Sequence, residues 1–321
     1  MSPKNSAQEP DDPVDSAGAD FPARVDGVAG SAGSGASEDS GDDGEHVGPD
    51  SQANASQEPG AKGPSAGRRF MESLSARSRG EGWEKPTGEL AKYRSGWRAA
   101  ARFVLQRVLF RAFVNSVVTP EVKAHRRVKS IRGPFVLVAN HTSHVDGPLL
   151  AMSLPWNQGR FLCTGAATEY WFEQGWPRRA FVRTMLNAFP IDRGGSRKHS
   201  GTSRRLLRSG VPILVFPEGG RQTTGKMADF SPGAAALAIG VGVPVVPAAI
   251  IGGYEAMPKG RNWPKKGRPP VRVVFGEPII SDEGESAVDF SGRIRERVKD
   301  LYQLHHDEVL GADARDEEET A

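Results

Sequence analysis

The chain has 321 residues and a formal net charge of +3, a total that hides a strong separation of charge along the sequence. Residues 1–60 carry 13 acidic and 2 basic side chains, residues 307–321 carry 7 and 1, and residues 61–306 therefore hold a net charge of +20. A body of this charge is expected to meet an anionic partner such as a phosphate ligand, an anionic membrane or nucleic acid. The single cysteine, Cys163, excludes an intramolecular disulfide and a Cys-rich zinc site.

The first part of the chain is predicted to be a disordered acidic tail, residues 1–69. It contains no Leu, Ile, Trp or Tyr and only one aromatic residue, Phe21. Such a segment buries too little apolar surface to offset its chain entropy. No apolar stretch of the kind that a secretory signal carries is visible near its start. A second acidic tail is predicted for residues 307–321.

Residues 70–130 are predicted to form a basic linker and interfacial helices. The most apolar stretch, 97–118, is interrupted by arginines, which argues against a spanning helix. These arginines are Arg98, Arg102, Arg107 and Arg111. One interpretation is a helix that lies on a membrane with its arginines reaching toward anionic headgroups. The alternative is a helix docked on the domain with its long side chains in solvent.

Short apolar runs alternate with helical stretches over residues 131–306, which predicts a single α/β domain. The expected fold is one mixed, parallel-rich sheet flanked by helices. The expected strands are 135–138, 160–164, 213–216, 243–249 and 271–275. The expected helices are 147–154, 178–188, 198–208, 233–241 and 286–310. Residues 252–270, rich in Gly, Pro, Lys and Arg, are expected to form a surface loop.

The stretch Asn140-His-Thr-Ser-His-Val-Asp146 follows the first of these strands. A tight turn into a helix near Asp146 brings its carboxylate to one imidazole nitrogen of His141 and leaves the other facing a cleft. An imidazole held in this way is a general base for a hydroxyl, and the carboxylate stabilises the imidazolium that forms. The sequence therefore offers His141 and Asp146 as catalytic candidates.

Two other interpretations of this stretch stay open. Asp146 is suited to cap the following helix, with His141 a polar residue at the end of a strand. A metal site at His141, His144 and Asp146 is a weaker alternative, because the sequence lacks a further histidine cluster downstream.

Two more apolar runs end in glycines and an arginine. Phe189-Pro-Ile-Asp-Arg193 is followed by two glycines, and Phe216-Pro-Glu-Gly-Gly-Arg221 contains Glu218 and Gly219. Glycines let a backbone approach a ligand, and guanidinium groups bind phosphate through paired hydrogen bonds. Together they predict one phosphate site with Arg193 and Arg221, where Glu218 orients the arginines or holds a substrate hydroxyl. Taken singly, each is equally compatible with an ordinary loop salt bridge.

A fourth segment, Val243-Pro-Val-Val-Pro247, places two prolines around a short apolar run, which is unusual for a central strand. It is interpreted either as a wall of the acyl or acceptor pocket, or as an edge strand or the entry to one.

In this order the four segments resemble the glycerophospholipid acyltransferase family, in particular the 1-acylglycerol-3-phosphate acyltransferases. The resemblance implies the glycerolipid acyltransferase fold, preceded by helices that hold the enzyme on a membrane. It also implies His141 as the base, Asp146 as its orienting carboxylate, and Arg193, Glu218, Gly219 and Arg221 at the acceptor. The third segment departs from the usual Phe-Pro-Glu-Gly-Thr-Arg-Ser, because Gly220 and Gln222 replace the two hydroxyl residues.

The function implied is acyl transfer from acyl-CoA or acyl-carrier protein to lysophosphatidic acid, giving phosphatidic acid. The expected partners are this lysophospholipid acceptor, the thioester donor and a phospholipid membrane surface, with no cofactor, metal or nucleic acid. The expected location is the cytoplasmic face of the cell membrane, as a peripheral or monotopic protein. Two alternatives remain: transfer to another lysolipid, a glycolipid or glycerol 3-phosphate, and a non-catalytic lipid-binding protein.

Overall fold

The computed structural model of the chain describes residue 83 and residues 86–167, 175–191, 201–261 and 263–311. The predicted acidic tail of residues 1–69 lies outside this part of the chain. So does most of the second predicted tail, although helix α10 (Ala287–Leu310) continues into it.

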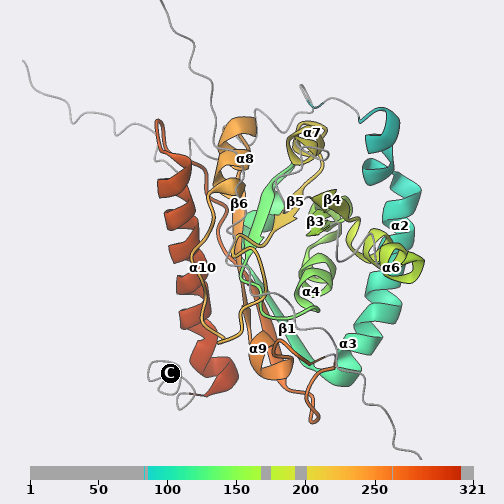
Figure 1. The fold of residues 1–321 in the computed structure, drawn as a ribbon, viewed down its shortest axis with the longest axis vertical. Coiled ribbons are helices and arrows are strands. Elements are labelled where there is room, and N and C mark those ends of the chain that lie inside the picture. Colours follow the sequence, from blue (N-terminus) through green and yellow to red (C-terminus); the bar gives the residue numbers. More distant parts are fainter. Residues whose placement is uncertain (1–82, 84–85, 168–174, 192–200, 262, 312–321) are drawn as a thin grey trace, which may run out of the picture.

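The centre of the fold is a seven-stranded sheet with the strand order β1-β7-β6-β2-β5-β3-β4 (Figure 1). Strands β6, β2, β5, β3 and β4 run parallel to one another, whereas β7 is antiparallel to β6 and parallel to β1. The strand bounds are β1 Thr119–Ala124, β2 Val136–Ala139, β3 Cys163–Ala167, β4 Phe189–Ile191, β5 Ile213–Val215, β6 Val245–Ile251 and β7 Pro270–Phe275. The prediction of a single mixed, parallel-rich sheet is confirmed.

Helices cover both faces of the sheet, as the sequence predicted (Figure 1). One apolar core packs the sheet against α4 (Asp146–Ser153), α6 (Trp176–Leu186) and the N-terminal helical segment. The short helix α5 (Trp156–Gly159) follows α4. Two further clusters pack the other face against α7 (Thr202–Arg208), α8 (Gly233–Val241) and α10. The remaining short elements are α9 (Gly253–Ala256) and the 3-10 helices η1 (Gly88–Arg94) and η3 (Arg126–Ser130). The central strands β2 and β6 are buried along their whole length, because helices cover both of their sides.

Three strands differ from the sequence prediction. Strand β4 is absent from the expected strands, although it lies in the apolar run that precedes Arg193. Strand β1 lies in the range assigned to the basic linker, and it escaped notice because an edge strand that begins Thr-Pro-Glu is half polar. Strand β3 begins at Cys163 rather than at residue 160, since the short helix α5 and a turn occupy the residues before it.

A long N-terminal helix runs along the outside of α4 and α6 (Figure 1). It consists of α2 (Gly96–Val104), a π-helical segment η2 (Leu105–Phe110) and α3 (Arg111–Val117), which follow one another without a break. Two of its four arginines are directed inward, whereas Arg98 and Arg111 are exposed, as the docked-helix interpretation expects. Arg102 donates to the carbonyl of Arg160 at 2.7 Å, and Arg107 donates to the carbonyl of Leu154.

The outer side of this helix carries several apolar side chains beside Arg98 and Arg111. Trp97, Val104, Val108 and Leu109 are 58% to 71% exposed. Exposed Trp263, from the loop after α9, packs edge-on against Phe113 at 5.4 Å between ring centroids. The predicted loop 252–270 thus includes the short helix α9 and extends the apolar face. Among the described residues, no helix combines the length and the apolar character that crossing a bilayer requires.

Candidate active site

The candidate site lies where two neighbouring parallel strands end. His141 follows β2 and Glu218 follows β5, and the two strands pair in register from Val136 with Ile213. The carboxyl ends of parallel strands in an α/β sheet are the usual place for ligand binding. Asn140 ties this edge to β6, because its amide both donates to the Ile250 carbonyl at 3.0 Å and accepts from the Ile250 N–H at 2.8 Å.

The pair predicted from the sequence is formed. His141 Nδ1 lies 3.0 Å from Asp146 Oδ2. A carboxylate only accepts hydrogen bonds, so Nδ1 carries the proton in the neutral imidazole and Nε2 keeps its lone pair. The ring lies on Phe216 with 4.1 Å between centroids and an 18° angle between planes, and the side chain is 21% exposed. The imidazole is therefore held on one face and at one nitrogen, while Nε2 is the nitrogen left to act as a base.

The Asp146 carboxylate is fully buried, and its environment is polar enough to keep it there. Oδ2 accepts from the N–H groups of Thr142 at 2.7 Å and Ser143 at 2.8 Å, and Oδ1 accepts from the Ser143 hydroxyl at 2.5 Å. Burial of a charge is costly unless it is paired and hydrogen-bonded, and these donors meet that condition. The capping interpretation is wrong, because Asp146 is already in the first turn of α4 and its side chain reaches back to the preceding turn.

Helix α9 closes over this turn. A Cβ built on Gly253 would lie 2.6 Å from Thr142 Oγ1 and 3.5 Å from Asp146 Oδ1. Only a glycine allows such a close approach, so Gly253 helps to keep water away from the carboxylate.

Glu218 is part of the site but makes other contacts than those expected. Its Oε1 accepts from the His141 N–H at 2.7 Å, and its Oε2 accepts from the Ala228 N–H at 3.0 Å. Burial raises the pKa of Glu218 to about 7, while the hydrogen bonds from Ala228, His141 and the Gln222 side chain lower it and the charge of Asp146 raises it. Glu218 thus joins two backbone segments of the site.

Of the remaining predicted site residues, the structure describes Gly219 and Arg221 but not Arg193. Gly219 has φ +76° with open space where a Cβ would lie, so the backbone conformation alone favours glycine there. Arg221 is half-buried in the same segment. Arg193 lies outside the described residues. Strand β4, which ends at Ile191, has its carboxyl end at the same edge of the sheet as β2 and β5.

The fourth predicted segment belongs to a central strand. Pro247 pairs with Val138 inside β6, between β2 and β7, which rules out the edge-strand interpretation. The Pro247 carbonyl still accepts from the Gly276 N–H at 2.8 Å, so the proline removes a donor from the sheet without leaving its carbonyl unpaired.

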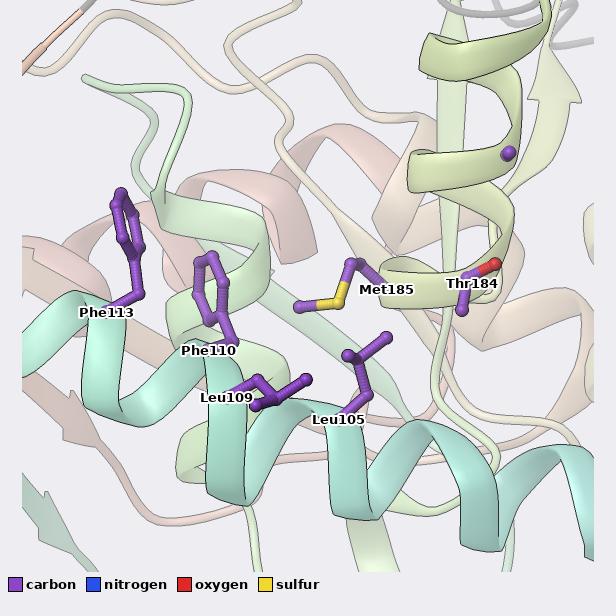
Figure 2. A pocket seen from close by; sticks show the side chains of 7 residues that line it. Leu105, Leu109, Phe110, Phe113, Thr184 and Met185 are labelled. Carbon is purple, nitrogen blue, oxygen red and sulfur yellow. The ribbon is translucent and has the colours of Figure 1, made fainter.

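An apolar groove of about 430 Å³ lies between the N-terminal helix and α6 (Figure 2). Its lining consists of Leu105, Leu109, Phe110, Phe113, Ala180, Thr184 and Met185. In Figure 2, Leu105, Phe110 and Phe113 project from the N-terminal helix, and Met185 extends from α6 toward Phe110. Leu109, which is 64% exposed, belongs both to the lining of the groove and to the exposed apolar side of the helix.

Sequence reasoning missed Ser143, Phe216 and Gln222 as parts of the site. Ser143 could have been noticed from its spacing of three residues before Asp146, whereas the ring contact of Phe216 and the bond from Gln222 depend on how β2 and β5 lie side by side. Among the described residues, no group of three or more His, Cys, Asp or Glu side chains is placed to hold a metal ion.

Comparisons with known proteins point to one family. Residues 119–251 match the family model described as Acyltransferase. A 1-acyl-sn-glycerol-3-phosphate acyltransferase of Chlamydomonas reinhardtii is 36% identical over 130 residues, which cover 40% of this chain and 37% of that protein. The 1-acyl-sn-glycerol-3-phosphate acyltransferase alpha of Mus musculus is 37% identical over 160 residues, covering 47% of this chain and 51% of that protein. The chain thus spans about half, or less, of the length of these two relatives.

A solved structure shares the fold. The 1-acyl-sn-glycerophosphate acyltransferase PlsC from Thermotoga maritima superposes with a TM-score of 0.53, over 74% of this chain and 89% of that one. At 22% sequence identity this likeness shows the arrangement of sheet and helices.

The raised pKa of Glu218 predicts a stability change with pH. Between the ordinary value of 4.5 and about 7, the folded state holds more protons at Glu218 than the unfolded state does. The contribution of Glu218 to the free energy of unfolding is therefore fully present below pH 4.5 and is lost as the pH rises to about 7. Relative to the Glu218→Gln variant, the wild-type protein should become less stable from pH 5 to 8, by at most about 1.4 kcal/mol per pH unit.

Urea denaturation of both proteins at several pH values measures this difference. A stability difference that instead grows in favour of the wild type with rising pH would mean that the hydrogen bonds outweigh burial at this carboxyl.

Proposed function

Because this chain belongs to the acyltransferase family through residues 119–251, we propose that it transfers a fatty acyl group from a thioester donor to the free hydroxyl of lysophosphatidic acid. The product of this reaction is phosphatidic acid. The observation that carries the proposal is the His141–Asp146 pair, with Nδ1 bonded to a fully buried carboxylate and Nε2 left as a base. The relatives named above support the choice of acceptor, since their names state it.

The proposed chemistry starts at His141 Nε2, which removes the proton from the acceptor hydroxyl. Asp146 stabilises the imidazolium that forms, as the carboxylate of a serine triad does. The resulting alkoxide attacks the thioester carbonyl and gives a tetrahedral oxyanion. When the carbon–sulfur bond breaks, the imidazolium returns the proton to the departing thiolate. The donor is acyl-CoA or acyl-carrier protein, and the step balances without a cofactor or an acyl-enzyme.

The acceptor phosphate is assigned to Arg193 and Arg221, the two arginines that the sequence predicts for it. Arg221 follows β5, on the segment that also carries Glu218, and Arg193 follows β4 in the sequence. Guanidinium groups fix a phosphate in one orientation through paired hydrogen bonds. Orientation of the hydroxyl toward the donor is able to supply about 7–11 kcal/mol of such a barrier.

The apolar face of the N-terminal helix is assigned to the membrane. Exposed Trp97, Val108 and Leu109 lie on it beside the apolar groove of Figure 2, and Trp263 extends it. Amphipathic helices lie in the headgroup region with their apolar side inward, and Trp is enriched at that level. We therefore propose that the protein is a peripheral or monotopic enzyme on the cytoplasmic face of the cell membrane.

A second acceptor class is favoured by one observation. Gly220 leaves open space where the family pattern has a threonine, and no atom lies within 4 Å of the position of its absent Cβ. A bulkier or different headgroup would find room there. Comparison of lysophosphatidic acid with phosphate-free lysolipids and with glycerol 3-phosphate, followed by lipid mass spectrometry, distinguishes these acceptors.

Replacement of the proposed base provides the main test. His141→Ala should lower kcat with lysophosphatidic acid and acyl-CoA by at least about 100-fold, because general base catalysis contributes about 10²–10⁴-fold. Binding to phospholipid vesicles should stay unchanged, which shows that the variant is folded. Thiol release measures the rate, and an active His141→Ala protein would refute the assignment of the base.

Loss of Arg221 should affect binding of the acceptor more than the rate of the chemical step. Arg221→Ala should raise the apparent KM for lysophosphatidic acid more than it lowers kcat, since a positioning cation for the phosphate is lost. Lys226→Ala removes an exposed cation from the same loop and should leave KM near the wild-type value. Equal KM values for the two variants would remove Arg221 from the phosphate site.

The membrane assignment predicts a difference between two exposed leucines. Leu109 is 64% exposed on the N-terminal helix, and Leu304 is 70% exposed on α10, on the opposite side of the molecule (Figure 1). Leu109→Asp should weaken binding to anionic vesicles by about 10-fold or more, because the apolar contact of one leucine is worth about 1.5–3 kcal/mol. Leu304→Asp should bind as the wild type does. Co-sedimentation measures both, and equal binding of the two variants would place the membrane contact elsewhere.

A further inference from the structure

The Glu218 carboxylate forms hydrogen bonds with the backbone of the protein itself. Each of its two carboxylate oxygens already accepts a backbone N–H, from His141 at 2.7 Å and from Ala228 at 3.0 Å. These donors belong to different segments, one at the end of β2 and the other beyond the turn that follows β5. A side chain bonded in this way holds the two segments at a fixed distance, because movement of either one breaks a hydrogen bond to a buried polar group.

The main chain of His141 is held from both sides by the same segment. Its N–H donates to Glu218, and its carbonyl accepts from the Gln222 N–H at 3.0 Å. The ring of Phe216, two residues before Glu218, lies against the imidazole. Residues 216–222 therefore contact both the backbone and the ring face of His141, whereas Asp146 bonds only to its Nδ1.

The Gln222 side chain completes this arrangement. It makes a further hydrogen bond to the Glu218 carboxylate, which favours the charged form against the effect of burial. The family pattern has a serine here, whose shorter side chain carries a single hydroxyl donor. Gln222 thus supplies both a backbone donor to His141 and a side-chain donor to the residue that holds His141.

We infer that Glu218 is a positioning residue that sets the location of His141, with Gln222 as its partner, and that it is not a ligand of the acceptor. The inference rests on the proposed acyl transfer for its kinetic consequence. Its structural content, the bond from the His141 N–H to Glu218, is independent of which reaction the site performs. Kinetics distinguish the two roles, since substitution of a positioning residue lowers kcat, whereas substitution of an acceptor ligand raises KM.

The first test is the Glu218→Gln variant. Its amide has one oxygen and one NH₂ group, so it is able to accept only one of the two backbone N–H groups and presents a donor to the other. We expect kcat to fall by about 10- to 100-fold, the effect of a catalytic group displaced by up to about 1 Å, with KM for lysophosphatidic acid unchanged. Glu277→Gln, the same substitution at a surface ion pair with Arg127, serves as the control and should keep the wild-type kcat.

The second variant is Gln222→Met, which keeps the length of the side chain and its backbone N–H but removes the donor to Glu218. We expect kcat to fall by about 2- to 10-fold, as loss of one hydrogen bond allows, again with KM unchanged. This milder change keeps the inference testable if Glu218→Gln does not fold. A rise in KM with an unchanged kcat in either variant would show that Glu218 binds the acceptor and would overturn the inference.

An NMR measurement separates this inference from the proposed function. The amide proton of His141, bonded to a carboxylate, should resonate downfield in the full-length wild-type protein and move upfield in Glu218→Gln, but not in Glu277→Gln. If the wild type transfers no acyl group and this shift occurs, the proposed function fails and the positioning role stands. An unchanged His141 amide resonance in Glu218→Gln would overturn the positioning role, whatever the activity.

Discussion

The site depends on a carboxylate that is completely removed from solvent. Two backbone N–H groups, a serine hydroxyl and the imidazole of His141 surround the Asp146 carboxylate. Without these partners, burial of the charge would be too costly for the turn to adopt this shape. The turn from Thr142 to Asp146 and the start of α9 are therefore arranged around one carboxylate, and the tautomer of His141 follows from it.

The sheet explains why the second half of the site comes from a distant part of the sequence. Strands β2 and β5 are neighbours in the sheet, although their paired residues are 77 positions apart in the sequence. This pairing brings Phe216 onto the imidazole and Glu218 under the backbone of His141. Asn140 extends the connection to β6 through Ile250, so three neighbouring strands fix the position of one histidine.

In the N-terminal helix, two arginines bond to the domain and several apolar side chains face solvent. Arg102 is buried and Arg107 partly so, and both donate to carbonyl groups of the domain, which fastens the helix from the inside. The apolar side chains that remain, including Trp97 and Leu109, face outward beside the groove of Figure 2. A helix that is basic in sequence thus exposes apolar side chains beside Arg98 and Arg111, and the membrane contact proposed for this face rests on its aliphatic and aromatic side chains.

The sequence by itself determined the features that depend on local spacing. The interval from His141 to Asp146 is short enough for one tight turn to pair them, and apolar runs of strand length between helical stretches predicted the buried sheet. Edge strands and element boundaries were harder to predict from the sequence. Strand β1 lacks an apolar run because it is partly polar, and the short helix α5 shifts the start of β3.

The tertiary structure alone decided the contacts between residues far apart in the chain. Residue spacing places Arg102 and Arg107 on different sides of a helix, but which groups of the domain they meet depends on how the helix docks. The sequence likewise marked Glu218 as part of the site and left its role open. That role follows from two backbone N–H groups, which every residue other than proline has, so no pattern of side chains reveals them before strands β2 and β5 lie side by side.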